Sequence, residues 1–435
     1  MDSGRQLALD VFSRSNPTAQ DVRRVIDALS ARGTFHFPQL STGLFSAAAG
    51  LSEDFAHSGY QSVWVRDTIH IAHAHWVIGQ PEVAVRAVTA LLEFFARHPH
   101  RWDDIIAGAA DRHDPMQRPH IRFDGTTLTE LPEKWAHAQN DALGYFLWLA
   151  CKLISAGLLT PTAAGCKVLH AVPRYFDAVE YWQDEDSGHW EEVRKIAASS
   201  IGAAVAGLTE YQSLLRSASP LALRGPIDSA HLDSLIAHGQ TALHSILPWE
   251  CRQPNPLQQR RYDAALLFLI YPLEVVSGET ADQIVRDVTE NLQGPHGIRR
   301  YPGDSYWCGE YKQLLAADER TVDFSADLGS RDRLLKPGTE AQWCIFDPIL
   351  AVHFARNYLD TKNPRDLQSH REYLLRSLQQ VTTAEMAAGP DRCPESYCCA
   401  RGEWVPNDIT PLLWTQANLR LALHFAEKIA AEVRG

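Results

Sequence analysis

Helical periodicity dominates the hydrophobic pattern of the chain, and strand-like alternation is scarce. Residues 82–97, EVAVRAVTALLEFFAR, place valine, leucine and phenylalanine on one face of a helix and charged side chains off it. Residues 141–151 and 412–425 are apolar nearly all round, as expected for helices that are buried on two sides. Further helices are predicted near residues 20–32, 66–78, 164–181, 197–213, 228–245, 260–271, 280–292, 339–357 and 365–382.

About twelve helices of these two kinds predict two concentric layers. The inner helices would contact each other and the outer layer, whereas the outer helices would show one face to water. We therefore expect an all-α fold, an (α/α)6 barrel, with its chemistry in the loops at one end, where packing constrains the sequence least. The competing architecture is a superhelical repeat array, but the sequence shows no fixed period of about 30–45 residues.

Composition and charge narrow the class of partner. The chain of 435 residues carries 53 acidic and 41 basic residues, a formal net charge of −12, with no stripe of lysine and arginine. We therefore expect no nucleic-acid partner and no membrane partner. The first residues lack the basic and apolar regions of a secretory signal, and every apolar run is far shorter than the roughly 20 residues of a membrane span. The sequence predicts a cytoplasmic protein.

Neither the cysteines nor the histidines predict a metal site. The eight cysteines form no CxxC pair, and Cys393, Cys398 and Cys399 have no second ligand pair at zinc-finger spacing. In residues 70–75, HIAHAH, the first two histidines share a helix face and the third does not. We expect free buried thiols, core histidines and no metal.

Aromatic and charged residues cluster at five points near the predicted starts of helices. Aromatic rings cover the apolar faces of a pyranose, and charged bidentate groups bind its vicinal hydroxyls. One such cluster could be a helix cap or a surface ion pair, whereas five at corresponding ends of helices favour a sugar site. The clusters are YQSVWVRD at 60–67, EKWAHAQND at 133–141, WEE at 190–192, RRYPGDSY at 299–306 and PESY at 394–397.

These motifs, in this order, resemble glycoside hydrolase family 15, the glucoamylase-like enzymes, and their relatives, the regulatory α and β subunits of phosphorylase kinase. The resemblance runs from about residue 40 to 426. VWVRD is similar to the family segment whose arginine and aspartate hold the non-reducing glucose, and WEEV is similar to the general-acid motif. RYPGDSY resembles the segment with a substrate-binding arginine, and PESY followed by PLLWTQANL resembles the catalytic-base loop and the last inner helix. The family has the (α/α)6 barrel, which agrees with the helix pattern.

The resemblance implies a role for each site residue. Glu191 would be the general acid and Glu395 the general base. No metal and no cofactor are implied, because two carboxylates carry the proton transfers. The implied substrate-binding residues are Trp64, Arg66, Asp67, Trp135, Trp190, Glu192 and Arg300.

The adjacent acids Glu191 and Glu192 are expected to act differently. Consecutive helical residues point about 100° apart, so the two cannot both protonate one glycosidic oxygen. By resemblance Glu192 would bind the sugar on the leaving side. An ionised Glu192 and the indole of Trp190 would both raise the pKa of Glu191 toward that of a competent acid.

The implied activity is that of an exo-acting, inverting α-glucoside hydrolase. It would release β-D-glucose from the non-reducing end of short α-glucans, malto- or isomalto-oligosaccharides, with trehalose as a further candidate. We expect a single catalytic domain over residues 1–435, with residues 1–40 as an N-terminal extension packed on the barrel.

The alternative is a non-catalytic, carbohydrate-binding regulatory protein resembling the kinase subunits. Arg194 and Lys195 stand where enzymes of the family usually carry small residues, and AASSIGAAVAGL at 197–208 looks more like the kinase subunits. Those subunits typically lack the second acid of the pair. This chain keeps both Glu192 and Glu395, which favours the enzyme.

Overall fold

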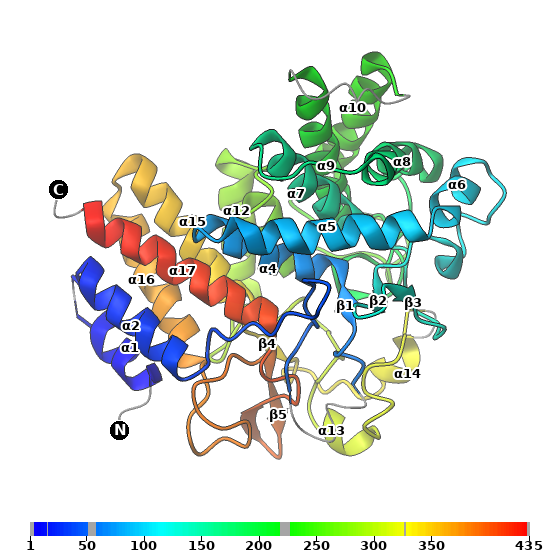
Figure 1. Ribbon diagram of the computed structural model, residues 1–435. Coiled ribbons are helices and arrows are strands. Elements are labelled where there is room, and N and C mark those ends of the chain that lie inside the picture. Colours follow the sequence, from blue (N-terminus) through cyan, green and yellow to red (C-terminus); the bar gives the residue numbers. More distant parts are fainter. Residues whose placement is uncertain (1–3, 15, 51–57, 218–226, 326–327, 433–435) are drawn as a thin grey trace.

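Helices of the computed structural model alternate along the chain between an outer and an inner layer (Figure 1). The structure describes residues 4–14, 16–50, 58–217, 227–325 and 328–432. The outer helices are α2 (Ala19–Ala31), α5 (Pro81–Arg97), α8 (Ala163–Val179), α10 (Ser229–Ile246), α12 (Gly278–Asn291) and α16 (Pro364–Gln379). The inner helices are α4 (Val65–Val77), α7 (Asn140–Ser155), α9 (Ala198–Arg216), α11 (Leu267–Ile270) with the preceding 3-10 helix η4 (Ala264–Leu266), α15 (Phe346–Thr361) and α17 (Leu413–Glu432).

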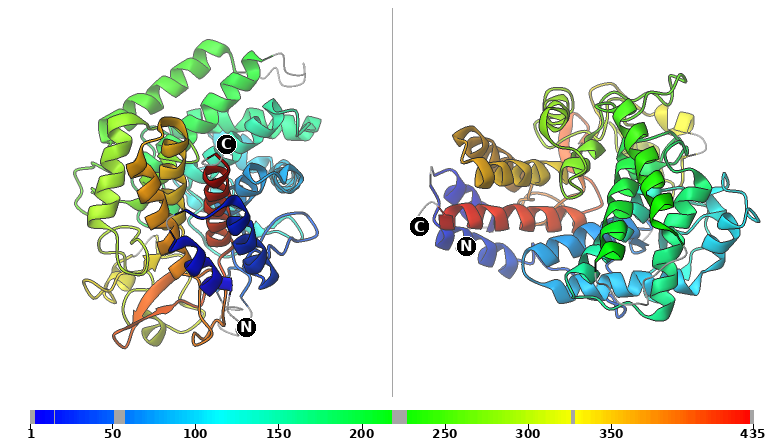
Figure 2. Two further views of the ribbon diagram at one scale, coloured as in Figure 1. Left: turned by 90° about the vertical axis from the view of Figure 1, so that its left-hand side faces the viewer. Right: turned by 90° about the horizontal axis from the view of Figure 1, so that it is seen from above.

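The inner helices close into a ring because each packs against two others. α4 contacts α7 and α17, α9 contacts α7 and α11, and α15 contacts α11 and α17. Each outer helix packs mainly on one inner helix: α5 on α4, α8 on α7, α10 on α9, α12 on α11, α16 on α15 and α2 on α17. The two views in Figure 2 allow these pairs to be followed around the molecule. This architecture is the predicted (α/α)6 barrel.

Two inner helices approach each other more closely than side chains with a Cβ would allow. A Cβ added to Gly144 of α7 would lie 2.4 Å from the carbonyl carbon of Ala203 in α9. A Cβ added to Gly207 of α9 would lie 2.7 Å from the carbonyl oxygen of Gly144. The small residues of 197–208 therefore serve backbone-to-backbone packing between α7 and α9.

The predicted helices are present, and two of them begin later than expected. The helix predicted near 260–271 begins at Ala264, where the carboxylate of Asp263 accepts a hydrogen bond from the backbone NH of Ala265 at 2.9 Å. The helix predicted near 339–357 begins at Phe346, because Gln342–Trp343 pair as a strand instead. In both cases a few residues before an inner helix belong to the segments that form the site and not to the helix.

Two small antiparallel sheets lie where inner helices begin. The first contains β1 (Val63–Trp64), β2 (Arg122–Asp124) and β3 (Thr129–Glu130), and the second contains β4 (Gln342–Trp343), β5 (Ser396–Ala400) and β6 (Glu403–Pro406). β1 leads directly into α4, and β4 shortly precedes α15. In Figure 1, β4 and β5 lie below the helices together with α13 (Tyr311–Leu314) and α14 (Leu328–Asp332). Strands of two to five residues are too short to show as alternation in the sequence.

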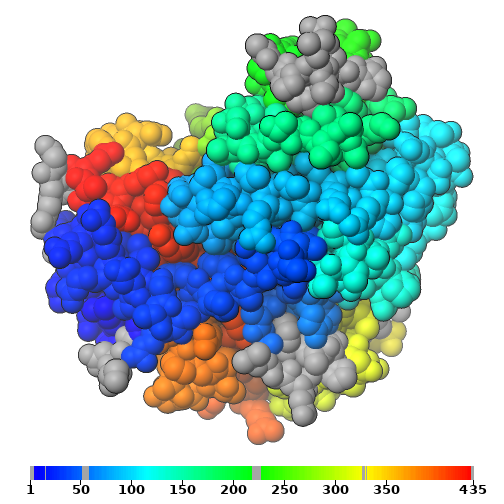
Figure 3. Space-filling view, in the orientation of Figure 1, coloured from blue at the N-terminus to red at the C-terminus, as the bar shows by residue number. Residues whose placement is uncertain are grey.

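The N-terminal helices lie against the C-terminal part of the chain. α1 (Gly4–Phe12) contacts α2 and α16, and α2 packs on α17. Figure 3 shows this blue N-terminal segment beside the red C-terminal helix. Within residues 1–40, α2 therefore supplies the outer helix that is paired with α17. In the part of the chain that the structure describes, no helix combines the length and apolar character needed to cross a bilayer.

Candidate active site

A pocket with about 740 Å³ of open space lies where the inner helices begin. The described residues that line it come from the first turns of α4 and α17 and from the loops that precede other inner helices. They combine indole and phenol rings with carboxyl and guanidinium groups, which suit the apolar faces and the hydroxyls of a pyranose. Of the predicted site residues, the pocket gathers Trp64, Arg66, Asp67, Trp135, Trp190, Glu191, Arg300 and Glu395.

Glu191 lies in a tight turn between the 3-10 helix η2 (Gly188–Trp190) and α9, and not in a helix. Its backbone is left-handed, with φ of 56° and ψ of 47°. For a residue other than glycine such a conformation costs about 1–3 kcal/mol, and it persists only where surrounding contacts hold it. This turn separates the two acids, whereas the 100° spacing of helical residues assumed from the sequence does not apply.

One oxygen of the Glu191 carboxyl group is held by the protein. Oε1 accepts hydrogen bonds from Trp64 Nε1 at 2.8 Å and from Gln139 Nε2 at 3.1 Å, with Arg66 Nη2 at 3.7 Å. Among the described residues, none donates to Oε2. Burial raises the pKa of Glu191, and Arg66, Gln139 and Trp64 oppose the rise. The expected direction of this pKa shift is therefore correct, but its main cause is burial rather than the charge of Glu192.

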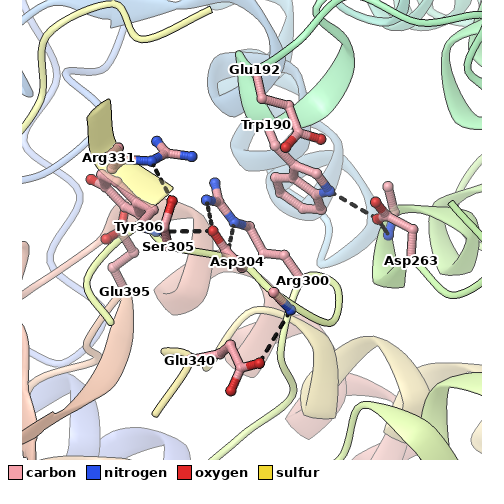
Figure 4. A network of polar contacts seen from close by, with 12 residues as sticks. Trp190, Glu192, Asp263, Arg300, Asp304, Ser305, Tyr306, Arg331, Glu340 and Glu395 are labelled. Atoms are coloured by element: carbon pink, nitrogen blue, oxygen red, sulfur yellow. Dashed lines mark hydrogen bonds and ion pairs between the residues drawn. The ribbon is translucent and has the colours of Figure 1, made fainter. Parts of the chain in front are cut away.

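Glu395 lies just before β5 and is 1% exposed. Tyr60 donates its hydroxyl hydrogen to Oε1 at 2.6 Å, and Asn407 Nδ2 donates to Oε2 at 2.5 Å. Burial raises the pKa of Glu395 to about 7, although both hydrogen bonds and the charge of Arg300 act to lower it. The hydroxyl of Tyr60 also lies 2.9 Å from that of Tyr306, which Figure 4 shows beside Glu395.

The two carboxyl groups are held by different aromatic residues. Trp64 binds Glu191 and Tyr60 binds Glu395, and the rings of Trp64 and Tyr60 are 5.2 Å apart between centroids. The negative charge of Asp67 helps to raise the pKa of Glu395, and the charge of Glu191 helps to raise that of Asp67. Burial raises the pKa of Asp67 to about 7. The pocket thus contains three carboxyl groups that favour protonation more than exposed ones do.

The predicted arginines are pre-positioned by buried carboxylates. Arg66 Nη1 donates to Asp141 Oδ2 at 2.9 Å and to Gln139 Oε1 at 2.8 Å. Arg300 makes a bidentate pair with Asp304, with Nε–Oδ2 at 2.6 Å and Nη2–Oδ1 at 2.7 Å (Figure 4). Such forks fix the direction of the remaining guanidinium donors.

Glu192 does not line the pocket. It is 1% exposed, and its carboxylate pairs with Lys195 Nζ at 2.8 Å and with the guanidinium of Arg260. Although burial acts in the opposite direction, these two cations hold the pKa of Glu192 well below its usual range. The structure therefore does not bring Glu192 to the place where its predicted role, binding the leaving sugar, would require it.

Several pocket residues were not assigned from the sequence. Tyr60 and Tyr306 line the pocket, and Gln139 contacts it through its hydrogen bond to Glu191. All three lie inside the aromatic and charged clusters of the sequence, so the clusters indicated their place. Trp343 and Arg331 lie outside every cluster and had no local signal. Arg331 is buried and donates from Nε to the Ser305 hydroxyl at 2.9 Å, and its Nη2 has no partner among the described residues.

The cysteines and histidines considered as metal ligands are buried, except Cys399, which is partly exposed. All eight cysteines are free, including Cys393, Cys398 and Cys399. His70 packs against the rings of Tyr145, Phe268 and Trp414. Within the described part of the chain, no group of three histidine, cysteine or acidic side chains is arranged to hold a metal ion.

Comparison with known proteins agrees with the fold and with a resemblance over residues 30–341. The model of glycosyl hydrolases family 15 matches residues 30–341, well over half of the chain. A probable phosphorylase b kinase regulatory subunit alpha from Caenorhabditis elegans is 25% identical over 409 residues. That match covers 81% of this chain and 30% of the relative, so the chain spans less than a third of the relative's length.

Solved structures share the barrel at low identity. A glycosidase variant in complex with glucose has a TM-score of 0.64 and 17% identity, with 99% of each chain covered. The glucoamylase from Saccharomycopsis fibuligera has a TM-score of 0.58 and 13% identity, with 96% of this chain and 98% of that chain covered. The structural neighbours establish the fold, and the family model, which covers most of the barrel, establishes that the chain belongs to glycosyl hydrolases family 15.

Proposed function

We propose that the chain is an exo-acting, inverting α-glucoside hydrolase that releases β-D-glucose from short α-glucans. Malto-oligosaccharides, isomalto-oligosaccharides and trehalose are the candidate substrates. The observation that carries the proposal is the pair of carboxyl groups in one pocket, each with its own donors. Glu191 has a raised pKa, and no described residue donates to its Oε2. Glu395 is held between Tyr60 and Asn407.

The two groups divide the proton transfers. Glu191 donates its proton to the glycosidic oxygen as the bond between that oxygen and C1 breaks. Glu395 accepts a proton from a water molecule whose oxygen forms the new bond to C1 from the opposite face. The proton count balances, because Glu191 loses one proton and Glu395 gains one. Attack from the opposite face converts an α-linkage into a β-product.

The remaining pocket residues bind the terminal glucose in this proposal. Arg66, Asp67 and Arg300 supply charge-assisted hydrogen bonds to its hydroxyls, and Trp64, Trp135 and Trp190 cover the sugar rings. The glucose bound by a structural neighbour supports a site of this chemistry.

A single catalytic domain over residues 1–435 is part of this proposal. Support comes from the continuous ring of inner helices and from α2, which packs on α17 and completes the outer layer from within residues 1–40.

Glucose release tests the proposal. The wild type, incubated with maltose, isomaltose and trehalose, should release glucose from at least one of them. Glu191→Gln and Glu395→Gln should each lower kcat by about 10²–10⁴-fold while the far-ultraviolet circular dichroism stays unchanged, since the acids act on substrate. Glu93→Gln, on the exposed side of α5, is the matched control and should keep full activity.

The second candidate is a regulatory protein that binds a glucan without turnover, favoured by the similarity to the kinase subunit. It predicts that the wild type binds malto-oligosaccharides and releases no glucose from any α-glucan. Calorimetric binding measured beside the glucose assay separates the two candidates.

A further inference from the structure

A buried cluster of charges lies behind Trp190, outside the residues that line the pocket. Glu192 Oε1 pairs with Lys195 Nζ at 2.8 Å and with Arg260 Nη1, and Oε2 lies 3.3 Å from Arg260 Nη2. Arg260 also pairs with Asp263 Oδ2 at 3.2 Å, and its guanidinium lies 3.4 Å from the ring centroid of Tyr301. Both oxygens of Glu192 are therefore used within the protein.

The same cluster holds the residue on the other side of Glu191. Trp190 Nε1 donates to Asp263 Oδ1 at 2.8 Å, a contact drawn in Figure 4. Asp263 in turn accepts from the backbone NH of Ala265 at the start of η4. Trp190 and Glu192 are thus both anchored to the beginning of one inner helix, and Arg260 joins the two anchors through Asp263.

Glu191 lies between these anchors in a left-handed backbone conformation that costs free energy. A strained turn keeps its shape only when neighbouring contacts prevent it from relaxing. The clamp formed by Glu192, Arg260, Asp263 and Trp190 supplies such contacts on both sides of Glu191. Trp64 and Gln139 then fix the carboxyl group itself.

We propose that Glu192 is a positioning residue: through Arg260 and Asp263 it holds the Trp190–Glu192 turn so that the free oxygen of Glu191 meets the glycosidic oxygen. Glu192 then makes no contact with the leaving sugar. This inference rests on the proposed function, in which Glu191 is the proton donor.

A series of aryl α-glucosides tests the inference, because these substrates lack a leaving sugar and differ in the pKa of the departing phenol. A misplaced proton donor slows hydrolysis of substrates with poor leaving groups more than that of substrates with good ones, because a good leaving group departs with little help from an acid. Glu192→Gln should therefore steepen the dependence of kcat on leaving-group pKa. We expect kcat on maltose to fall about tenfold with KM nearly unchanged, whereas the most activated aryl glucoside stays within about threefold.

Companion variants keep the test decisive. Arg260→Gln should reproduce the steeper dependence, and Arg260→Lys, which retains the charge, should restore most of the loss. Glu192→Gln leaves the cations Lys195 and Arg260 without their carboxylate, which could prevent folding. In that case the double variant Glu192→Gln with Lys195→Met, which removes one of the two cations, is used. Glu130→Gln, in a half-buried pair with Arg101, is the matched control and should leave the dependence unchanged.

Two results would overturn the inference while leaving the proposed function in place. One is an unchanged leaving-group dependence combined with a raised KM for maltose, which is the signature of a lost sugar ligand. The other is an equal loss on every substrate after correction for the folded fraction, which indicates a purely structural residue. A wild type that hydrolyses none of the substrates overturns the proposed function and this inference together.

Discussion

Asp67 and Glu395 have pKa values raised to about 7 for the same reason, the loss of water around a buried carboxylate. They differ in their hydrogen bonds. Glu395 accepts one from Tyr60 and one from Asn407, whereas Asp67 receives no side-chain donor among the described residues. Asp67 is therefore the acid whose ionised form a sugar hydroxyl can stabilise most, and Glu395 is the acid prepared to act on water.

Asp67→Asn should lower kcat/KM by at least about two orders of magnitude. This is the scale of losing about 3 kcal/mol of charge-assisted binding in the transition state. Initial rates on maltose measure the effect. Asp282→Asn on the exposed face of α12 is the control, and near-wild-type activity in Asp67→Asn would remove this residue from the site.

Tyr60→Phe should move the acid limb of the pH profile of kcat/KM to higher pH. Glu395 works as a base only when ionised, so activity falls as the pH drops through its pKa of about 7. The Tyr60 hydrogen bond lowers that pKa, and its removal raises the pKa further, by on the order of one pH unit.

The pH profiles of wild type and Tyr60→Phe, recorded on one substrate, check this sign. An acid limb that stays in place or moves to lower pH would contradict Glu395 as the base.

The raised pKa of Glu395 also affects the stability of the protein. The pKa of Glu395 is higher in the folded protein than in the unfolded chain. Its protonation therefore stabilises the fold at a pH below the pKa of the unfolded chain, and this contribution is lost as the pH rises through about 7.

At the scale of elements, the contact between α7 and α9 links packing to the site. α7 follows Gln139, and α9 follows the turn that holds Glu191, so the distance between these helices sets the distance between Gln139 and Glu191. Gly144 and Gly207 allow the two backbones to approach.

Gly144→Ala should destabilise the protein by about 3 kcal/mol, because the new methyl group would meet backbone atoms of α9 that cannot rotate away. Chemical denaturation measures the change. Gly165→Ala in α8 is the matched control: its Cβ would make ordinary contacts at 3.5 Å, and the helix propensity of alanine predicts a gain of up to about 1 kcal/mol. Equal stability of the two variants would contradict close packing of α7 and α9.

At the scale of the whole molecule, ring closure decides which acids can act together. Glu191 precedes α9 and Glu395 precedes α17, and the two meet in one pocket because both helices begin at the same end of the ring. An inverting pair needs a carboxyl separation of roughly 6.5–9.5 Å, whereas a retaining pair lies near 5 Å. Our proposal requires the wider arrangement, with Trp64 holding Glu191 and Tyr60 holding Glu395.

Proton NMR of the first product tests this arrangement. β-Glucose should appear before α-glucose when an α-linked substrate is hydrolysed, because water attacks from the face opposite the leaving group. The spectra must be recorded before mutarotation mixes the anomers. Early α-glucose would mean that Glu395 acts as a nucleophile or takes no part.

Local sequence pattern by itself determined the helices, their two layers and the motifs that surround the pocket. Periodicity reports which face of a helix is buried, and buried faces dictate layers. Only the tertiary structure decided which acid meets which partner. Tyr60 reaches Glu395 across 335 positions, and Arg260 reaches Glu192 across 68, so no local pattern reveals either pair. Resemblance assigned both Glu191 and Glu192 to the sugar site, but folding places Glu191 in the pocket and encloses Glu192 between two cations. A buried carboxylate needs partners that only the folded chain brings together.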